Sequence, residues 1–168
     1  YYVPTRILFG SGQLNKLSKK RLPGKKALIV ISSGKSTRAN GYLDRVEEQL
    51  KLAGVESVVF DKVLPNPTKP VVMAGAQAAR DNGCDFIIGL GGGSSIDSAK
   101  AIAIMATNDG DLWDYVYGGT GGAQRMKNPP LPVVAITTTA GTGTEADAWA
   151  VVTNEETSEK IGFGNDRT

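Results

Sequence analysis

A glycine triplet followed by serine is the stretch of this chain best suited to holding a phosphate. The triplet 91–93 follows a short apolar run over 86–90, and from Ser94 the apolar spacing becomes that of a helix. Glycines leave the backbone uncovered, and the first turn of a helix presents free N–H groups and the positive end of its dipole. Ser94 is a good N-cap residue, and Asp97 three positions later completes a start that resembles a capping box. The stretch predicts a strand, a glycine turn and a helix N-terminus.

The spacing of this stretch is an imperfect match to the dinucleotide-binding fingerprint. Gly89, Gly91 and Ser94 occupy its fixed positions, and such a match alone is weak. It also follows two earlier strand–helix units, whereas the ordinary fingerprint follows the first strand. The alternative is a tight turn that only packs closely.

A second polar loop, 32–36, follows the apolar run over 26–31. Its Gly34, Lys35 and Ser36 do not form a P-loop, because Ile29 stands where that motif requires glycine. Many NAD-binding domains place an acidic residue here to hold the ribose 2′-hydroxyl, whereas this loop offers hydroxyl groups and a cation. That chemistry favours a 2′-phosphate. A solvated turn is the alternative.

A third loop, 137–144, contains five threonines separated by glycine and alanine. Hydroxyl and backbone N–H groups of this kind hold phosphates, riboses or carboxamides. The alternative is a threonine-rich turn that caps a helix. Because ligands of open α/β sheets bind at the carboxyl ends of the strands, three such loops on one edge favour a single extended ligand.

The elements that would position these loops alternate between strands and helices. The expected strands are 5–10, 26–31, 55–60, 86–90 and 133–137, the expected helices are 13–20, 42–52, 71–81 and one from 94, and a hairpin joins 148–153 to 161–163. Two prolines stiffen the loop 64–68. We predict an α/β fold: a Rossmann-like, mostly parallel sheet with helices on both faces, plus a C-terminal β-hairpin.

Composition excludes several classes of function. The chain has 168 residues, which predicts one domain, and a net charge of +2 without a basic stripe, so we expect no nucleic-acid partner. It has no long apolar segment and no signal peptide, so we expect no membrane association and a cytoplasmic location. The single cysteine, Cys84, opens an apolar run and is expected to be a core thiol. The chain has no histidine, which removes the usual metal ligand and general base.

Four motifs together resemble the iron-containing alcohol dehydrogenase family. They are LPNPT (64–68), GGGSSIDSAK (91–100), TTTAGTGTEA (137–146) and VVTNEETSEK (151–160), and the likeness extends over essentially the whole chain. The resemblance implies that residues 1–168 are a dinucleotide-binding domain. Complete members add an all-helical C-terminal domain, with one Asp and three His that hold a divalent metal such as iron. None of those ligands is assigned here, so the metal site is expected only in a full-length relative, and this chain is either a truncation or an unusually short protein.

The resemblance also implies roles for individual residues. Gly92, Gly93 and Ser94 would face the cofactor pyrophosphate, with Asp97 supporting that turn or only capping its helix. Asn66 would lie beside a ribose or the adenosine, unless it is only a turn residue. The remaining implied contacts are Thr138, Thr139 and Thr142 near the nicotinamide half, Lys160 at the ribose hydroxyls, or else as a solvated lysine, and Gly34, Lys35 and Ser36 at a 2′-phosphate. Asp147 stands where relatives often carry a neutral residue, which leaves its role open.

The activity implied is hydride transfer between NADP, or NAD as second choice, and a small alcohol or aldehyde. No residue of the chain is expected to be a catalytic acid or base. Two alternatives stay open: a nucleotide-binding module without catalysis, and a glycerol-dehydrogenase-like member of the superfamily. An isolated domain would expose apolar surface, for which 111–122 is the candidate unless it folds onto its own sheet, and homo-oligomers would form through such a surface.

Overall fold

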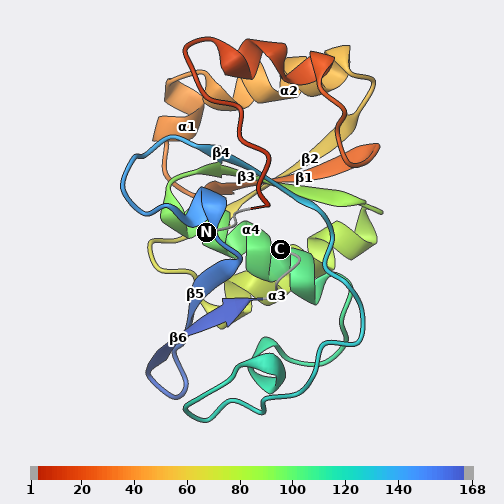
Figure 1. Cartoon of the computed structure of the whole chain (residues 1–168). Helices are drawn as coiled ribbons and strands as arrows, with labels where there is room; N and C mark the ends of the chain where they lie inside the picture. Colours follow the sequence, from red (N-terminus) through yellow and green to blue (C-terminus); the bar gives the residue numbers. More distant parts are fainter. Residues whose placement is uncertain (1–3, 165–168) are drawn as a thin grey trace.

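The computed structural model describes residues 4–164, which form a four-stranded sheet, helices on both of its faces and a separate hairpin (Figure 1). The strands are β1 (Lys26–Ser32), β2 (Glu56–Val63), β3 (Phe86–Gly91) and β4 (Val133–Thr137), in the spatial order β2-β1-β3-β4. All three pairings are parallel. The chain moves outward from β1 to β2 and returns to β3 on the other side of β1. This reversal is the point at which open α/β sheets bind ligands.

The two central strands are apolar because each is covered on both faces. Every residue of β3 is buried, and so are residues 27–31 of β1. Along β1 the side chains alternate: Leu28 and Val30 pack into one hydrophobic core, and Ile29 and Ile31 into the other. The predicted parallel sheet is confirmed, and β2 runs to Val63, beyond its expected end at residue 60.

Helices cover both faces of this sheet (Figure 1). The 3-10 helix η1 (Gln13–Lys19) and α2 (Tyr42–Leu52) lie over one face, and α3 (Lys69–Asp81) and α4 (Gly93–Met105) over the other. A short helix, α1 (Ser36–Ala39), leads from β1 into α2. Within residues 4–164 no helix is both long and apolar enough to cross a bilayer.

The start of α4 differs from the sequence prediction. The helix begins at Gly93, its N-cap residue is Gly92, and no side chain caps it. Gly91 has φ of 147°, a conformation open to glycine, and this turn brings the chain into helix before Ser94. The Ser94 hydroxyl instead accepts a hydrogen bond from the Asn66 N–H at 3.3 Å. The predicted N-cap was therefore wrong, and the first turn of α4 has no capping side chain.

The predicted C-terminal hairpin is confirmed and packs on α4. It consists of β5 (Trp149–Asn154) and β6 (Glu159–Gly164), which pair antiparallel. Ala150, Val152 and Phe163 are almost fully buried in the core that contains α4. Ile161 packs against the same core. The hairpin thus buries one face against the helix that follows the glycine turn.

The expected strand over 5–10 is absent, since residues 4–9 have no regular secondary structure. A strand needs a neighbour that accepts its backbone hydrogen bonds, and within the described residues both sheets are complete without this segment. Ile7, Leu8 and Phe9 are 65%, 42% and 93% exposed. Part of the exposed apolar surface of the described residues therefore lies here.

The aromatic segment 111–122, expected to expose apolar surface, is mostly packed against the molecule. Its 3-10 helix η2 (Leu112–Tyr115) starts with a capping box formed by Asp111 and Asp114. Trp113 and Tyr115 are 7% and 6% exposed, because their rings join the core below α3. Of its aromatic residues only Tyr117 is exposed as expected. The segment therefore follows the alternative, in which it packs on its own domain, and self-association stays a prediction.

Candidate functional site

The glycine turn between β3 and α4 is packed so closely that an added side chain would have to displace its neighbours. A Cβ on Gly91 would lie 2.7 Å from the Ser95 Oγ, and one on Gly93 would lie 3.1 Å from a Thr142 methyl. The first N–H groups of a helix have no acceptor within that helix. The hydrogen bonds of α4 begin with the N–H groups of Ser95 and Ile96, which both donate to the Gly92 carbonyl. Uncapped N–H groups at a positive helix end are an anion-binding arrangement.

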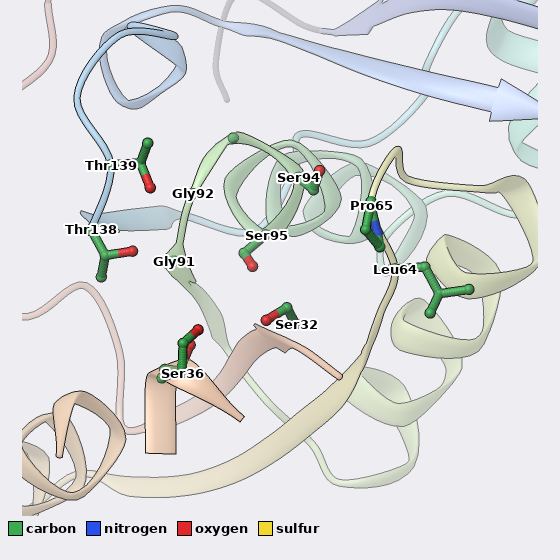
Figure 2. Close-up of a pocket in the computed structure, with 12 residues that line it drawn as sticks. Ser32, Ser36, Leu64, Pro65, Gly91, Gly92, Ser94, Ser95, Thr138 and Thr139 are labelled. Carbon is green, nitrogen blue, oxygen red and sulfur yellow. The ribbon is translucent and has the colours of Figure 1, made fainter. Parts of the chain in front are cut away.

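A cleft of about 310 Å³ opens in front of this turn (Figure 2). Every parallel strand of the sheet contributes the segment that follows its carboxyl end. The lining residues are Ser32, Ser36, Thr37, Leu64, Pro65, Gly91, Gly92, Gly93, Ser94, Ser95, Thr138 and Thr139. In Figure 2 the hydroxyl groups of Ser32, Ser95 and Thr138, from three elements, point toward the enclosed space. The cleft therefore offers hydroxyl donors opposite a helix N-terminus.

Six residues predicted from the sequence line this cleft: Ser36, Gly92, Gly93, Ser94, Thr138 and Thr139. Thr142 does not line the cleft, but its methyl group lies next to Gly93. Ser32 and Gly91 lie in polar loops singled out by the sequence, and Leu64, Pro65 and Ser95 lie in its motifs, although none of the five was assigned a contact. Only Thr37 lies outside these loops and motifs. The position of these six residues beside predicted residues at strand ends is the only signal that would have assigned them to the cleft.

Asn66 and Lys160 are 94 residues apart in sequence and meet at the edge of the glycine turn. The Lys160 Nζ donates to the Asn66 Oδ1 at 2.7 Å, and the Asn66 N–H donates to the Ser94 hydroxyl. Asn66 has φ of 60°, a left-handed conformation that asparagine tolerates well. The hairpin is held to this loop by a second bond, from the Thr153 N–H to the Pro67 carbonyl at 2.7 Å. The Lys160 ammonium group is therefore hydrogen-bonded to Asn66, and the two side chains form a pair.

The turn after β1 is looser than the glycine turn. Gly34 and Lys35 are exposed and do not line the cleft, although Ser36, the first residue of α1, does. Arg38, a further cation of this region, donates to Asp61 of β2 at 2.8 Å. Among the ion pairs of residues 4–164, Lys35 takes part in none. Of the three residues predicted for a 2′-phosphate, the structure brings only Ser36 into the cleft wall.

Asp97 neither caps α4 nor touches the glycine turn directly. Its Oδ1 accepts a hydrogen bond from the Thr144 hydroxyl, and its Oδ2 accepts the Val151 N–H at 3.0 Å. It thereby joins α4 to the 3-10 helix η3 (Thr144–Ala146) and to β5. The alternative in which Asp97 only caps its helix was wrong, because the helix begins at Gly93 and Asp97 points toward the hairpin side.

Asp147, whose role the sequence left open, and Lys100, to which it assigned none, belong to the same hydrogen-bond network as Asp97. The buried Lys100 donates to the Asp147 Oδ1 at 3.2 Å, and Asp147 also accepts the Trp149 N–H at 2.6 Å. The sequence analysis did not single out Lys100. A single charged residue inside an apolar helix predicts a buried cation with a partner, and this pattern would have identified it. Asp147 is thus a structural acceptor.

A second cleft, of about 520 Å³, adjoins the first on the α2 side of β4. Its walls are mostly apolar, with Phe9, Leu14 and Ile136 among them. Thr138 and Thr139 line both clefts. The threonine loop therefore forms a partition, and its position determines the shape of both spaces.

The described residues offer neither a metal centre nor a reactive thiol. No group of three or more His, Cys, Asp or Glu side chains is arranged around a common point in residues 4–164. Cys84 is buried in the hydrophobic core, and burial raises the pKa of its thiol, so the nucleophilic thiolate is disfavoured. The donor set does not fit the metal that the family resemblance implies, and the cysteine is the core thiol that its sequence context predicted.

The fold and the cleft define a Rossmann-like α/β domain with a glycine turn and hydroxyl-rich loops at the carboxyl edge of its sheet. Residues 4–168 match the family described as iron-containing alcohol dehydrogenase, and the chain belongs to this family.

Known relatives agree with this assignment. The chain is 36% identical over 165 residues to the probable NADH-dependent butanol dehydrogenase 1 of Bacillus subtilis, and 40% identical over 163 residues to the 1,3-propanediol dehydrogenase of Citrobacter freundii. These alignments cover 98% and 96% of this chain but 41% of either relative. The crystal structure of NADH-dependent butanol dehydrogenase A from Thermotoga maritima superposes with a TM-score of 0.89 at 36% identity, covering 99% of this chain and 41% of that one. The chain thus spans about two fifths of the length of these proteins.

Proposed function

We propose that this chain is the dinucleotide-binding domain of an alcohol dehydrogenase or aldehyde reductase that uses NADP(H). The observation that carries the proposal is the uncapped start of α4, whose glycine turn faces the threonine loop across one cleft. A chain that bound no phosphate would gain nothing from leaving these backbone N–H groups uncapped, because a capping side chain stabilises a helix by about 0.5–2 kcal/mol.

The dinucleotide would lie along the carboxyl edge of the sheet. Its pyrophosphate would accept hydrogen bonds from the backbone of Gly92, Gly93 and Ser94. The absence of a side chain at Gly93 supports this binding mode. A Cβ there would come within 3.1 Å of Thr142 and would cover the backbone that the pyrophosphate approaches. The paired Asn66 and Lys160 side chains offer polar groups beside the glycine turn, where a ribose of the dinucleotide would lie.

The nicotinamide half would lie beside the threonine loop. Thr138 and Thr139 line the cleft on that side, and their hydroxyl groups suit a carboxamide or a ribose. When bound, the nicotinamide supplies the hydride chemistry, and the contribution of this chain is to orient the ring and to exclude water from it. The small alcohol or aldehyde is proposed from the relatives, two of which are named butanol and propanediol dehydrogenases.

The proposal assigns NADP(H) because the turn after β1 contains no carboxylate. Gly34 stands near the place of the acidic residue that binds a ribose 2′-hydroxyl in many NAD enzymes, and Lys35 next to it is exposed and unpaired within residues 4–164. A lysine attracts a 2′-phosphate as a point charge. The Bacillus subtilis relative and the Thermotoga maritima protein are both named NADH-dependent, so both nucleotides must be compared directly.

A second candidate is a nucleotide-binding module that performs no catalysis by itself. It is favoured by the lack of a metal-binding cluster in residues 4–164. Alcohol oxidation assayed with added divalent metal separates the two candidates. Turnover that follows the metal concentration would exclude the module, whereas binding without turnover would support it.

Calorimetric titration with NADPH and with NADH tests the proposal. We expect binding of both, tighter for NADPH, and loss of both in Gly93→Asp. A preference for NADH would keep the dinucleotide site and overturn the 2′-phosphate assignment. If neither nucleotide binds, the proposed function of this chain fails.

A further inference from the structure

A buried lysine in the middle of α4 is not explained by contact with a nucleotide. The Lys100 side chain is 4% exposed, and its neighbours in the helix, Ala99 and Ala101, are fully buried. An unpaired charge removed from water is costly, so a buried ammonium group is retained only where its N–H groups are paired. The acceptors of Lys100 identify the segment that it organises.

All the acceptors of Lys100 lie at the end of the threonine loop or in the segment directly after it. Its Nζ donates to the Thr144 Oγ1 at 2.7 Å, to the Asp147 Oδ1 at 3.2 Å and to the Trp149 carbonyl at 2.6 Å. The ammonium group has one N–H for each of these acceptors. One side chain thereby holds residues 144–149 against α4.

Asp97, one helical turn before Lys100, holds the same segment from the other side. The Thr144 hydroxyl accepts from Lys100 and donates to Asp97, so that it bridges the cation and the carboxylate. Asp97 also accepts the Val151 N–H and so extends the attachment into β5. Removing the Thr144 hydroxyl would separate the two halves of this network.

Between these anchors few hydrogen bonds hold the threonine loop. The Thr137 hydroxyl donates to the Thr139 carbonyl at 2.9 Å, and the Thr142 methyl group packs beside Gly93. At its start the Thr138 N–H donates to the Gly91 carbonyl at 2.9 Å, and at its end Thr144 is fixed by Lys100. In between, Gly141 and Gly143 have positive φ, and no atom lies within 4 Å of a Cβ placed on either. The hydrogen bonds that tie this loop to other segments of the described chain therefore lie at its two ends.

We propose that Lys100 is a positioning residue: through Thr144 and Asp147 it holds the loop 138–143 against the glycine turn, and this placement sets the affinity for the dinucleotide. The ligand in this inference rests on the proposed function, whereas the ordering of the loop by Lys100 does not. Lys100 touches no nucleotide in this scheme and acts through the loop alone.

The test combines hydrogen exchange of the loop with nucleotide titration in the same set of variants. In Lys100→Met and in Thr144→Val we expect the amides of 138–143 to exchange about tenfold faster and nucleotide affinity to fall about tenfold, within the usual range for coupled sites. Thr144→Ser keeps the bridging hydroxyl and should recover most of both. The control is Arg80→Met, which removes a bond to the Met105 carbonyl at the far end of α4 and should lower thermal stability only.

Each result decides the inference. Unchanged exchange of 138–143 in folded Lys100→Met or Thr144→Val would overturn it, with or without a nucleotide. Weaker binding without faster exchange would also overturn it, since the effect would then not pass through the loop. Equal loss of affinity in Arg80→Met would indicate general destabilisation. If the unmodified chain binds neither nucleotide, the proposed function fails and the exchange result alone decides the role of Lys100.

Discussion

Two turns at the same edge of the sheet differ in how much the fold constrains them. The turn 91–95, between β3 and α4, is packed against the threonine loop, and Cβ atoms on Gly91 or Gly93 would approach neighbours within 2.7 Å and 3.1 Å. The turn 32–36, between β1 and α1, is exposed over residues 33–36, and a Cβ on Gly34 would meet only the Ser32 hydroxyl at 3.5 Å. One turn has a shape imposed by its surroundings, and the other has room for different side chains.

This difference corresponds to what each turn is proposed to bind. The pyrophosphate is common to NAD and NADP, and a rigid backbone site serves both. The 2′ position is where the two cofactors differ, and an open turn permits a change of preference by substitution at the surface. We therefore expect substitutions in the first turn to affect both nucleotides, and those in the second turn to affect mainly the ratio between them.

The largest effect is expected for Gly93→Asp in the constrained turn. The new side chain meets Thr142 and places a negative charge where the pyrophosphate would bind. Charge-assisted hydrogen bonds contribute about 1.5–3 kcal/mol, so affinity for NADPH and NADH alike should fall about 100-fold by calorimetry. Gly34→Ala is the matched control and should change either affinity less than about twofold, since its Cβ makes only an ordinary contact of 3.5 Å with the Ser32 hydroxyl. Similar losses in both variants would remove the contrast between the turns.

A smaller, selective effect is expected for Gly34→Asp. A carboxylate there would repel a 2′-phosphate and accept a hydrogen bond from a 2′-hydroxyl, so the ratio of NADPH to NADH affinity should fall about tenfold, equivalent to about 1.4 kcal/mol. Thermal stability should stay nearly unchanged because the position is exposed. Titration with both nucleotides provides the measurement, and an equal loss for both would show that this turn does not discriminate between them.

Lys35→Gln should have a weaker effect in the same direction. Exposed ion pairs contribute about 0.2–1 kcal/mol, which is at most about a fivefold loss of NADPH affinity, with NADH unaffected. The difference should disappear at high ionic strength, because salt screens an exposed charge. A loss that persists in high salt would indicate a buried contact, in conflict with the exposure of Lys35.

The smallest effect concerns the hairpin that carries Lys160. Hydrogen bonds from the Thr120 and Thr157 hydroxyls lower the pKa of Glu159 below its usual value near 4.5. A carboxyl group with a lowered pKa in the folded state stabilises the fold above its unfolded pKa, and this stabilisation is lost as pH falls through the folded value. The thermal midpoint should therefore fall more below pH 4.5 in the unmodified chain than in Glu159→Gln. An equal fall of the thermal midpoint in both proteins would show that the hydrogen bonds of Glu159 do not contribute to stability.

Local patterns were sufficient for three strands and for the glycine turn, although not for the N-cap of α4, which is Gly92 rather than Ser94. The strands 26–31, 86–90 and 133–137 followed from apolar runs, and the glycine turn followed from its composition. Errors occurred where a distant segment supplies the partner. The segment 5–10 has strand-forming residues but no neighbour within the described chain, and 111–122 is aromatic yet buried because α3 and the hairpin provide a surface for it.

The amino-acid sequence by itself determined the parallel α/β fold and the position of three polar loops at strand ends, because hydrophobic periodicity and glycine placement act over a few residues. Only the tertiary structure decided that Lys160 meets Asn66, that Asp97 holds the hairpin rather than its own helix, and that Lys100 fixes the end of the threonine loop. These contacts join residues 44 to 94 positions apart. Their geometry depends on how helices and hairpin pack, and no local spacing encodes it.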